Sequence, residues 1–332
     1  MCIRDSHGGV NSDPKNPFHI STRPTPLPSD CIELMYSEMG PKEGTAHHTA
    51  LEKKMGFSYR NLLGELMYAY MTSRLDIGYA VTTLSKFSTS PSEFHYKLLK
   101  TVAKYLKATA SWGIRFKRLE PMKIDENDYH DKRDKGGFYR SEAYNIPDDP
   151  SFTSVFDIDV DKPILHYFVD AAHANDLQKR RSTTGVVFTF MGGPIVYKSK
   201  TQSLTAGSST EAEFIAAHSA AKIAIYLRMI LKQLGFEQKQ PTLIHIDNMS
   251  ALQMINDNIS PTGHCRHLDI QYWQIQEWAE GHNAHIKCKH IPGILNPSDD
   301  LTKPLGYVLH SCLLYTSPSP RDATLSRMPS SA

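Results

Sequence analysis

GVVFTFMGGPIVYK, residues 185–198, is the stretch that decides the fold of this chain. It holds two short apolar runs, 185–190 and 195–198, on either side of Gly192-Gly193-Pro194. Glycine and proline supply the backbone conformations that a tight turn needs, so the pattern predicts a β-hairpin. A further apolar run at 164–169 precedes this stretch. We therefore predict three consecutive strands joined as hairpins.

The rest of the chain after residue 200 alternates between helical and extended patterns. A helix is expected over about 209–234, because Ser-Thr precedes Glu211 at its start and Gly235 follows its end. The later elements are expected as a strand at 243–246, helices at 251–255 and 268–279, a strand at 284–290 and a last helix from about Asp299. This order predicts an α/β fold, a mixed five-stranded sheet with flanking helices.

The part of the chain before the sheet has a different character. Apolar residues at helical spacing predict helices over 59–70, 77–87 and 92–107, and 113–116 alternates like a strand. We divide the chain into 1–6, 7–57 as an extended segment, 58–118 as a small helical unit, 119–162 as a charged linker or insertion, 163–310 as the sheet domain, and 311–332 as a tail.

Composition bounds the class of protein. The 332 residues have room for about two domains; 40% are hydrophobic, 22% are charged, and the net charge is +2. These values exclude a mostly disordered chain, a coiled coil and a collagen-like fibre. No apolar run approaches the roughly 20 residues of a membrane-spanning helix, so no membrane partner is expected. Five cysteines without regular spacing favour a reducing compartment.

Four acidic residues lie at the ends of predicted elements: Asp170, Glu213, Asp247 and Asp299. In open α/β sheets, reactive groups gather at strand ends and at the helix termini beside them. Four converging carboxylates would repel each other without a cation, and such hard oxygen ligands suit Mg²⁺. A single acid at such a place is explained equally well as a helix cap or a solvated side chain.

Two other groups of residues invite a functional interpretation. His264, Cys265, His267, Cys288 and His290 lack the paired spacing of a zinc site, so no zinc is assigned. Basic residues in and after the first hairpin are candidate phosphate contacts, with an ordinary solvated turn as the alternative. The candidates for nucleic-acid binding are Arg180, Arg181, Ser182, Lys198 and Lys200.

Several motifs in fixed order resemble a known family. RRSTTGVVFTFMGGPIVYKSKTQSLTAGSSTEAEFIAAHSAAK (180–222), IHIDNMSAL (244–252), CRHLDIQYWQI (265–275) and NPSDDLTKPL (296–305) resemble the ribonuclease H domain of copia-type LTR-retrotransposon Pol polyproteins. The segment 59–109, which begins YRNLLGELM, is similar to the thumb and connection region that ends the reverse transcriptase of such polyproteins. The opening MCIRDS and the segment from Cys312 resemble translated sequencing-adapter read-through, an artefact.

The resemblance implies a ribonuclease H-like fold and hydrolysis of the RNA strand of an RNA–DNA hybrid during reverse transcription. It implies that Asp170, Glu213, Asp247 and Asp299 bind two Mg²⁺, for which Mn²⁺ substitutes, with Asp300 as the alternative to Asp299. The expected partners are the hybrid and the remainder of the reverse transcriptase, and the expected location is intracellular, in cytoplasmic retrotransposon particles. Polymerase activity is not expected, because no aromatic residue followed by paired aspartates is present in the sequence.

Two rival functions stay open at this point. A non-catalytic nucleic-acid-binding fragment of a decayed element would keep the fold without the activity. An integrase-like transposase would need a pattern of three acids, and the TEAEF and LTKPL motifs, at 210–214 and 301–305, speak against it. A convergence of the four carboxylates in space is the observation that favours the nuclease.

Overall fold

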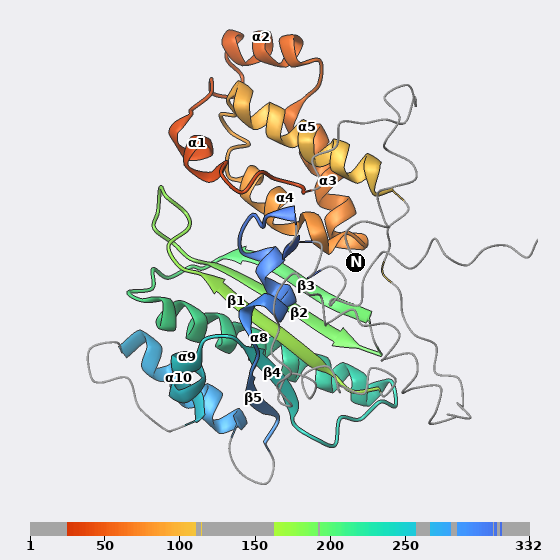
Figure 1. Cartoon of the computed structure of the whole chain (residues 1–332), viewed down its shortest axis with the longest axis vertical. Helices are drawn as coiled ribbons and strands as arrows, with labels where there is room; N and C mark the ends of the chain where they lie inside the picture. The colour runs from red at the N-terminus through yellow and green to blue at the C-terminus, as the bar shows by residue number, and fades with distance from the viewer. Residues whose placement is uncertain are drawn as a thin grey trace, which may run out of the picture.

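The fold was analysed in a computed structural model, which describes residues 25–110, 114, 163–191, 193–256, 266–279, 284–307, 309–310 and 313. The described residues form a helical block, residues 25–110, and a five-stranded sheet with its own helices. Figure 1 shows the helical block on one side of the sheet and α8, α9 and α10 on the other. The expected linker at 119–162, the segment 1–6 and the tail at 311–332 apart from residue 313 lie outside the described residues, as does most of the expected strand at 113–116.

The sheet is mixed, with the strand order β3-β2-β1-β4-β5. Its strands are β1 (His166–Ala172), β2 (Thr183–Phe190), β3 (Gly193–Thr201), β4 (Thr242–Ile246) and β5 (Ile286–His290). The first three pair as antiparallel hairpins, while β4 pairs parallel to β1 and β5 parallel to β4. The predicted fold class, a mixed five-stranded α/β sheet with flanking helices, is therefore confirmed.

Helix α8 (Ser209–Gln233) packs its small residues against one face of the sheet. Its buried positions include six alanines, at 212, 216, 217, 220, 221 and 224, which let the helix lie close to Tyr167 and Val169 of β1. The Ser208 side chain caps the helix by accepting from Glu211 N–H at 3.1 Å, and Gly235 follows the last turn at φ +87°. Helices α9 (Met249–Asn256) and α10 (Arg266–Ala279) cover the β4–β5 side of the same face.

By length and composition alone, helix α8 is also long and apolar enough to cross a membrane, although no such segment was expected from the sequence. An 18-residue window of it has a mean hydropathy of 1.4, and 56% of that window is buried inside the protein. Its apolar character has a local cause, because it packs on the sheet and also against helices α9 and α10 within one core.

The helical block contains α3 (Tyr59–Thr72), the 3-10 turn η1 (Leu75–Ile77), α4 (Gly78–Ser85) and α5 (Glu93–Ala108). These agree closely with the predicted helices, except that the helix expected at 77–87 is the shorter α4, which η1 directly precedes. Helix α5 begins with a capping box, in which Ser92 and His95 satisfy each other's backbone N–H.

Two further helices lie in the segment that was expected to be extended. They are α1 (Ile32–Ser37) and α2 (Ala46–Met55). Only Met35 of α1 and His48 of α2 are buried, so neither helix shows the apolar period by which a helix is recognised. Local signals stabilise α2 instead, since Thr45 caps its start and Gly56 ends it at φ +81°.

The helical block and the sheet share one apolar contact region. Val187 of β2 and Leu301 are buried in the same cluster as Leu66, Tyr70 and Leu84 of the block. Hydrogen bonds reinforce the contact: Tyr197 Oη donates to Tyr70 O at 2.7 Å, and Ser199 N–H donates to Tyr70 Oη at 2.9 Å. The face of the sheet opposite α8 is thus covered by the helical block in this region.

The expected last helix begins as a 3-10 turn. After β5 the chain forms η2 (Gly293–Leu295) and then η3 (Pro297–Leu301), which contacts β1, β2, α4 and η1. Pro304 has no N–H to donate and its ring clashes with a preceding helical turn, so an α-helix cannot run on from Asp299 through this point. The helix expected from about Asp299 is therefore a short 3-10 turn that begins at Pro297, and this turn carries Asp299.

Candidate active site

Four elements bring the four predicted carboxylates to one end of the sheet. Asp170 lies within β1, which extends three residues beyond the apolar run at 164–169, and Asp247 follows β4 directly. Glu213 is on the first turns of α8, and Asp299 is on η3. Because β1 and β4 are parallel neighbours, their acids emerge at adjacent positions of the same sheet edge.

Three of the acids lie within reach of one small ion. Asp170, Asp247 and Asp299 each offer a carboxylate oxygen, and these three atoms all lie within 4.8 Å of one another. Asp170 and Asp299 are only 3% and 4% exposed, while Asp247 is half-buried. A cluster of oxygen ligands with this separation suits a hard divalent cation.

Glu213 joins the cluster from the side of α8. Its Oε1 accepts a hydrogen bond from Ala171 N–H at 3.0 Å, one residue beyond Asp170. Its Oε2 is buried and has no hydrogen-bond partner in the structure. Asp299 Oδ1 is also buried without a hydrogen-bond partner. Buried carboxylate oxygens normally have a partner, so two that lack one beside a trio of acids fit a site for a cation.

The electrostatics of the cluster also favour a site for a cation. Burial raises the pKa of Asp247 to about 6, and the neighbouring charge of Asp170 adds to this effect. Burial and the charges of Asp170 and Asp247 raise the pKa of Glu213 far above its usual range. Burial and Asp170 likewise raise the pKa of Asp299. Like charges in a low-dielectric site disfavour ionisation, and a bound divalent cation would reverse this.

Two residues that the sequence analysis did not select support the acids. Lys303 Nζ forms a 2.9 Å ion pair with Asp299 Oδ2, and Thr302 Oγ1 donates a hydrogen bond to Asp170 Oδ2. Burial opposes the charge of Lys303, but the nearby carboxylates outweigh it and raise the pKa of Lys303. The sequence signal was present, because Asp299 and Lys303 are four residues apart, a spacing that places side chains on one face of a helical turn.

Residues around η3 hold it against β1 and β2. Asn296 Nδ2 donates to Val169 O at 2.9 Å, and Asn296 Oδ1 accepts from Ser298 N–H at the start of the turn. Gly185 pairs with Asp170 across the β1–β2 ladder. A Cβ at Gly185 would lie 2.5 Å from Ser298 O, so only glycine lets η3 approach β2 this closely.

Comparisons with known proteins identify relatives of this chain. The chain is 31% identical over 258 residues to the retrovirus-related Pol polyprotein from transposon TNT 1-94 of Nicotiana tabacum, an alignment that covers 77% of this chain. It is 27% identical over 249 residues, 74% of this chain, to the corresponding polyprotein from transposon RE1 of Arabidopsis thaliana. The chain belongs to the retrovirus-related Pol polyproteins of transposons. It spans 16% and 14% of the length of these two relatives.

Other comparisons are weaker or local. This Pol chain is 29% identical over 169 residues to the secreted RxLR effector protein 161 of Plasmopara viticola, covering 51% of the chain and 90% of the effector. No protein-family model matches. Similar solved structures include LC11-RNase H1 from compost (TM-score 0.33, 16% identity, 42% of this chain and 94% of that one) and RNase H1 of Halobacterium salinarum (TM-score 0.30, 13%, 42% and 93%). The fold of the Pol chain therefore rests on its own strand order and pairing.

Asp300, the alternative to Asp299 as the fourth acid of the Pol chain, contacts His310. Asp300 is 5% exposed, and its Oδ1 lies 2.6 Å from His310 Nδ1, away from the three clustered aspartates. The structure therefore brings Asp299, and not Asp300, together with Asp170 and Asp247. Among the zinc candidates, Cys288 is buried in the core and burial raises its pKa to about 12, which disfavours the thiolate that zinc needs.

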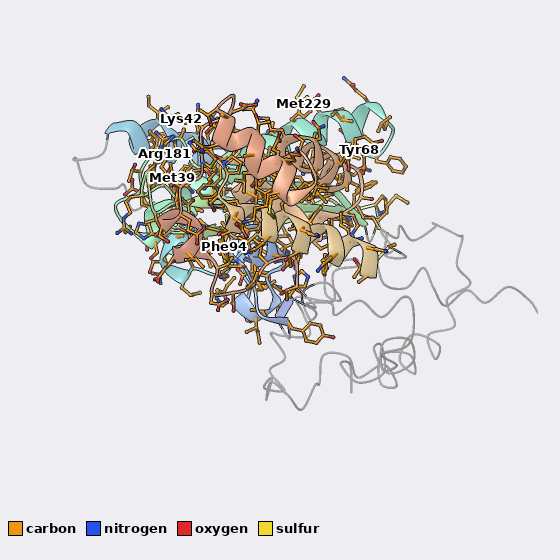
Figure 2. All side chains as sticks on the ribbon, turned by 90° about the horizontal axis from the view of Figure 1, so that it is seen from above. Met39, Lys42, Tyr68, Phe94, Arg181 and Met229 are labelled. Atoms are coloured by element: carbon orange, nitrogen blue, oxygen red, sulfur yellow. The ribbon has the colours of Figure 1, made fainter. Side chains whose placement is uncertain are left out.

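The five nucleic-acid candidates of the Pol chain separate into three groups. Arg180 is exposed and Arg181 half-buried in the loop between β1 and β2, which touches the helical block through a 3.0 Å ion pair between Lys86 and Asp176. Figure 2 shows Arg181 on the same side of the molecule as Met39 and Lys42 of the block. Ser182 is fully buried, and its hydroxyl accepts from Ala174 N–H, so it stabilises the loop and is not exposed to a phosphate.

Lys198 and Lys200 form the third group. Both are exposed on β3. Ser199, between them, pairs with Gly185, which in turn pairs with Asp170. Side chains alternate along a strand and directly paired residues share a face, so both lysines project from the face opposite to that of the Asp170 carboxylate.

Proposed function

We propose that the sheet part of this Pol chain is a ribonuclease H, which hydrolyses the RNA strand of an RNA–DNA hybrid during reverse transcription in retrotransposon particles. The convergence of Asp170, Asp247 and Asp299 within 4.8 Å, with Glu213 beside them, carries the proposal. One of the similar solved structures, LC11-RNase H1, is in complex with an RNA/DNA hybrid.

Asp170, Glu213, Asp247 and Asp299 would hold two Mg²⁺, with Mn²⁺ as a substitute. Such ions, when bound, lower the pKa of a water and stabilise the leaving oxygen of a phosphodiester. The buried oxygens without partners, Glu213 Oε2 and Asp299 Oδ1, are the observation that fits the residues to this group.

The protein's own groups orient the site. Thr302 fixes the rotamer of Asp170, the Ala171 N–H fixes that of Glu213, and Lys303 balances part of the negative charge at Asp299. Arg180 and Arg181 would contact the backbone phosphates of the hybrid, since most affinity for nucleic acid comes from phosphate contacts. Selectivity for the RNA strand would come from contacts to its 2′-hydroxyl groups.

The experiment uses the full chain, an end-labelled RNA–DNA hybrid and Mg²⁺. We expect cleavage of the RNA strand, which Asp247→Asn abolishes and EDTA prevents. Asp30→Asn is the matched control, because Asp30 is exposed in the helical block and its replacement leaves the site intact. The same labels on duplex DNA should stay uncut, which separates this activity from that of an integrase-like transposase.

Two outcomes would contradict the proposal. Binding of the hybrid without cleavage in Mg²⁺ or Mn²⁺ would favour the non-catalytic nucleic-acid-binding protein. Cleavage that Asp247→Asn leaves unchanged would show that the nuclease in the assay is a contaminant.

A further inference from the structure

A buried ion pair joins Arg74 to Asp76 of η1, one of the elements of the helical block that contact η3. Arg74 binds Asp76 through two hydrogen bonds, Nε to Oδ1 at 2.9 Å and Nη2 to Oδ2 at 2.7 Å. Their side chains are 7% and 0% exposed. Arg74 also donates to Thr109 O at 2.9 Å, which ties the end of α5 to the same pair. Removing one partner of such a buried ion pair strongly destabilises the fold, because the other charge stays buried without compensation.

Hydrogen bonds continue from this pair to the sheet part. Tyr105 Oη of α5 donates to Asp76 Oδ2 at 2.8 Å and lies 3.0 Å from His310 Nε2. Because the single hydroxyl proton of Tyr105 is directed to Asp76, the Tyr105 oxygen accepts from His310 Nε2–H. His310 Nδ1 then lies 2.6 Å from Asp300 Oδ1. All of these side chains are buried.

The end of this chain of contacts is the residue next to Asp299. Asp300 points toward His310 and the helical block, while Asp299 points toward the carboxylate cluster. Both belong to a turn of five residues in which Thr302 N–H donates to Asp299 O, so the two side chains share one short rigid backbone. Holding the Asp300 carboxylate therefore fixes the direction in which Asp299 leaves the turn.

We propose that the helical block positions Asp299 in the nuclease site, through the buried series Arg74, Asp76, Tyr105, His310 and Asp300. The hydrogen bonds described above join these five residues to one another, and we infer that they act on Asp299 through the η3 backbone. The proposal rests on the proposed function only in that Asp299 serves there as a metal ligand. Partners of ligands typically alter metal affinity or activity by about 10- to 100-fold when they are replaced.

These residues could instead serve only to hold the helical block to the sheet, and that role predicts a different result. If they only hold the block to the sheet, their loss lowers the melting temperature without changing the order of η3 or the Mg²⁺ dependence of the chain. A positioning role changes both of these properties. The test therefore needs readouts that are local to η3.

Tyr105→Phe and Asp300→Asn in the full chain provide the test. Phe keeps the ring of Tyr105 and removes only its hydroxyl, and Asn keeps the shape of Asp300 and removes its charge. Tyr197→Phe is the matched control, because Tyr197 Oη also bonds across the contact between block and sheet, to Tyr70 O, without reaching η3. If Tyr105→Phe fails to fold, Asp300→Asn carries the test alone.

Hydrogen–deuterium exchange and Mg²⁺ titration are the measurements. We expect peptides that contain 297–303 to exchange faster in both variants than in the parent chain, while peptides from β4 are unchanged. The Mg²⁺ concentration that gives half of the metal-induced rise in melting temperature should increase about 10-fold or more. Tyr197→Phe should alter neither quantity.

The outcomes separate this inference from the proposed function. Unchanged exchange at 297–303 in both variants would overturn the positioning role, whether or not the parent chain cleaves a hybrid. A parent chain without Mg²⁺ response or cleavage would overturn the nuclease, and the exchange measurement would still decide whether the helical block orders η3.

Discussion

Asp299 and Asp300 are adjacent in the chain, yet their carboxylates have separate partners, Lys303 for Asp299 at 2.9 Å and His310 for Asp300 at 2.6 Å. One side chain faces the acidic cluster and the other faces the helical block. This division gives the 3-10 turn two roles, because the same five residues supply a candidate metal ligand and a contact between two parts of the molecule.

The two glutamates of STEAEF should differ sharply in their effect on cleavage. Glu213→Gln removes a charge from the cluster, and we expect it to reduce hybrid cleavage by more than about 100-fold, beyond the range for outer partners of a metal site. Glu211→Gln is the matched control, since Glu211 accepts from Gly207 N–H at the start of α8 and an amide oxygen can do the same. Rates on a labelled hybrid under single-turnover conditions measure both. Similar losses in the two variants would contradict the role of Glu213.

The pH dependence of stability should reveal the raised pKa of Asp247. A carboxyl whose pKa in the folded state is about 6, against about 4 in the unfolded chain, binds more protons when folded. Its contribution to stability is therefore lost as the pH rises from about 4 through 6, in the absence of metal. As the pH rises across this range, the melting temperature of Asp247→Asn should increase relative to that of the parent chain. Added Mg²⁺ should remove this increase.

The comparison with Asp247→Asn is needed because other groups act in the opposite direction. Burial lowers the pKa of His166 to about 4 and that of His245 to about 3, so both bind more protons in the unfolded state and add stability as the pH rises. These contributions are common to both proteins and cancel in the difference. A difference that stays constant between pH 4 and pH 7 would refute the raised pKa.

Gly185→Ala should disturb the site through the backbone. A Cβ at this position meets Ser298 O at 2.5 Å and pushes η3 away from β2, which we expect to cost about 1–3 kcal/mol and to reduce cleavage. Gly64→Ala is the matched control in α3, where a Cβ meets nothing within 4 Å, and we expect it to stabilise the chain by about 0.4–1 kcal/mol. Urea denaturation of both variants gives the signs, and equal signs would be evidence against the close contact of η3 with β2.

Binding of the hybrid should depend on the loop arginines more than on the β3 lysines. Replacing Arg180 and Arg181 by Gln removes two charges from the loop that joins β1 to β2. We expect weaker binding, and we expect the slope of log Kd against log salt concentration to fall by about 1–2. The Lys198→Gln, Lys200→Gln double variant makes the same change of charge on the opposite face and should leave the slope nearly unchanged. Fluorescence anisotropy at several salt concentrations measures both, and a reversed order would place the hybrid on the other face.

Much of the site was predictable from the sequence, and the parts that were not have physical reasons. Asp170, Glu213, Asp247 and Asp299 lie in or next to elements that the sequence patterns indicate, and their motifs occur in a fixed order. The destination of Asp300 depends on His310, ten residues away and beyond a proline, so no local pattern indicates it. The face of Lys198 depends on its register with β2, which pairing in space decides. Short, solvated helices such as α2 carry no apolar period.

Val187 and Leu301 are buried within the core of the helical block, although both belong to the sheet part of the chain. Separating the sheet part from the helical block would expose the apolar side chains that the contact buries. Anyone who excises the sheet domain for crystallography or enzymology will therefore need to replace at least Val187, Leu301 and Tyr197 with polar residues. The same contact limits how the sequence can change, because a larger or smaller side chain in the helical block requires a compensating change of volume in the sheet part.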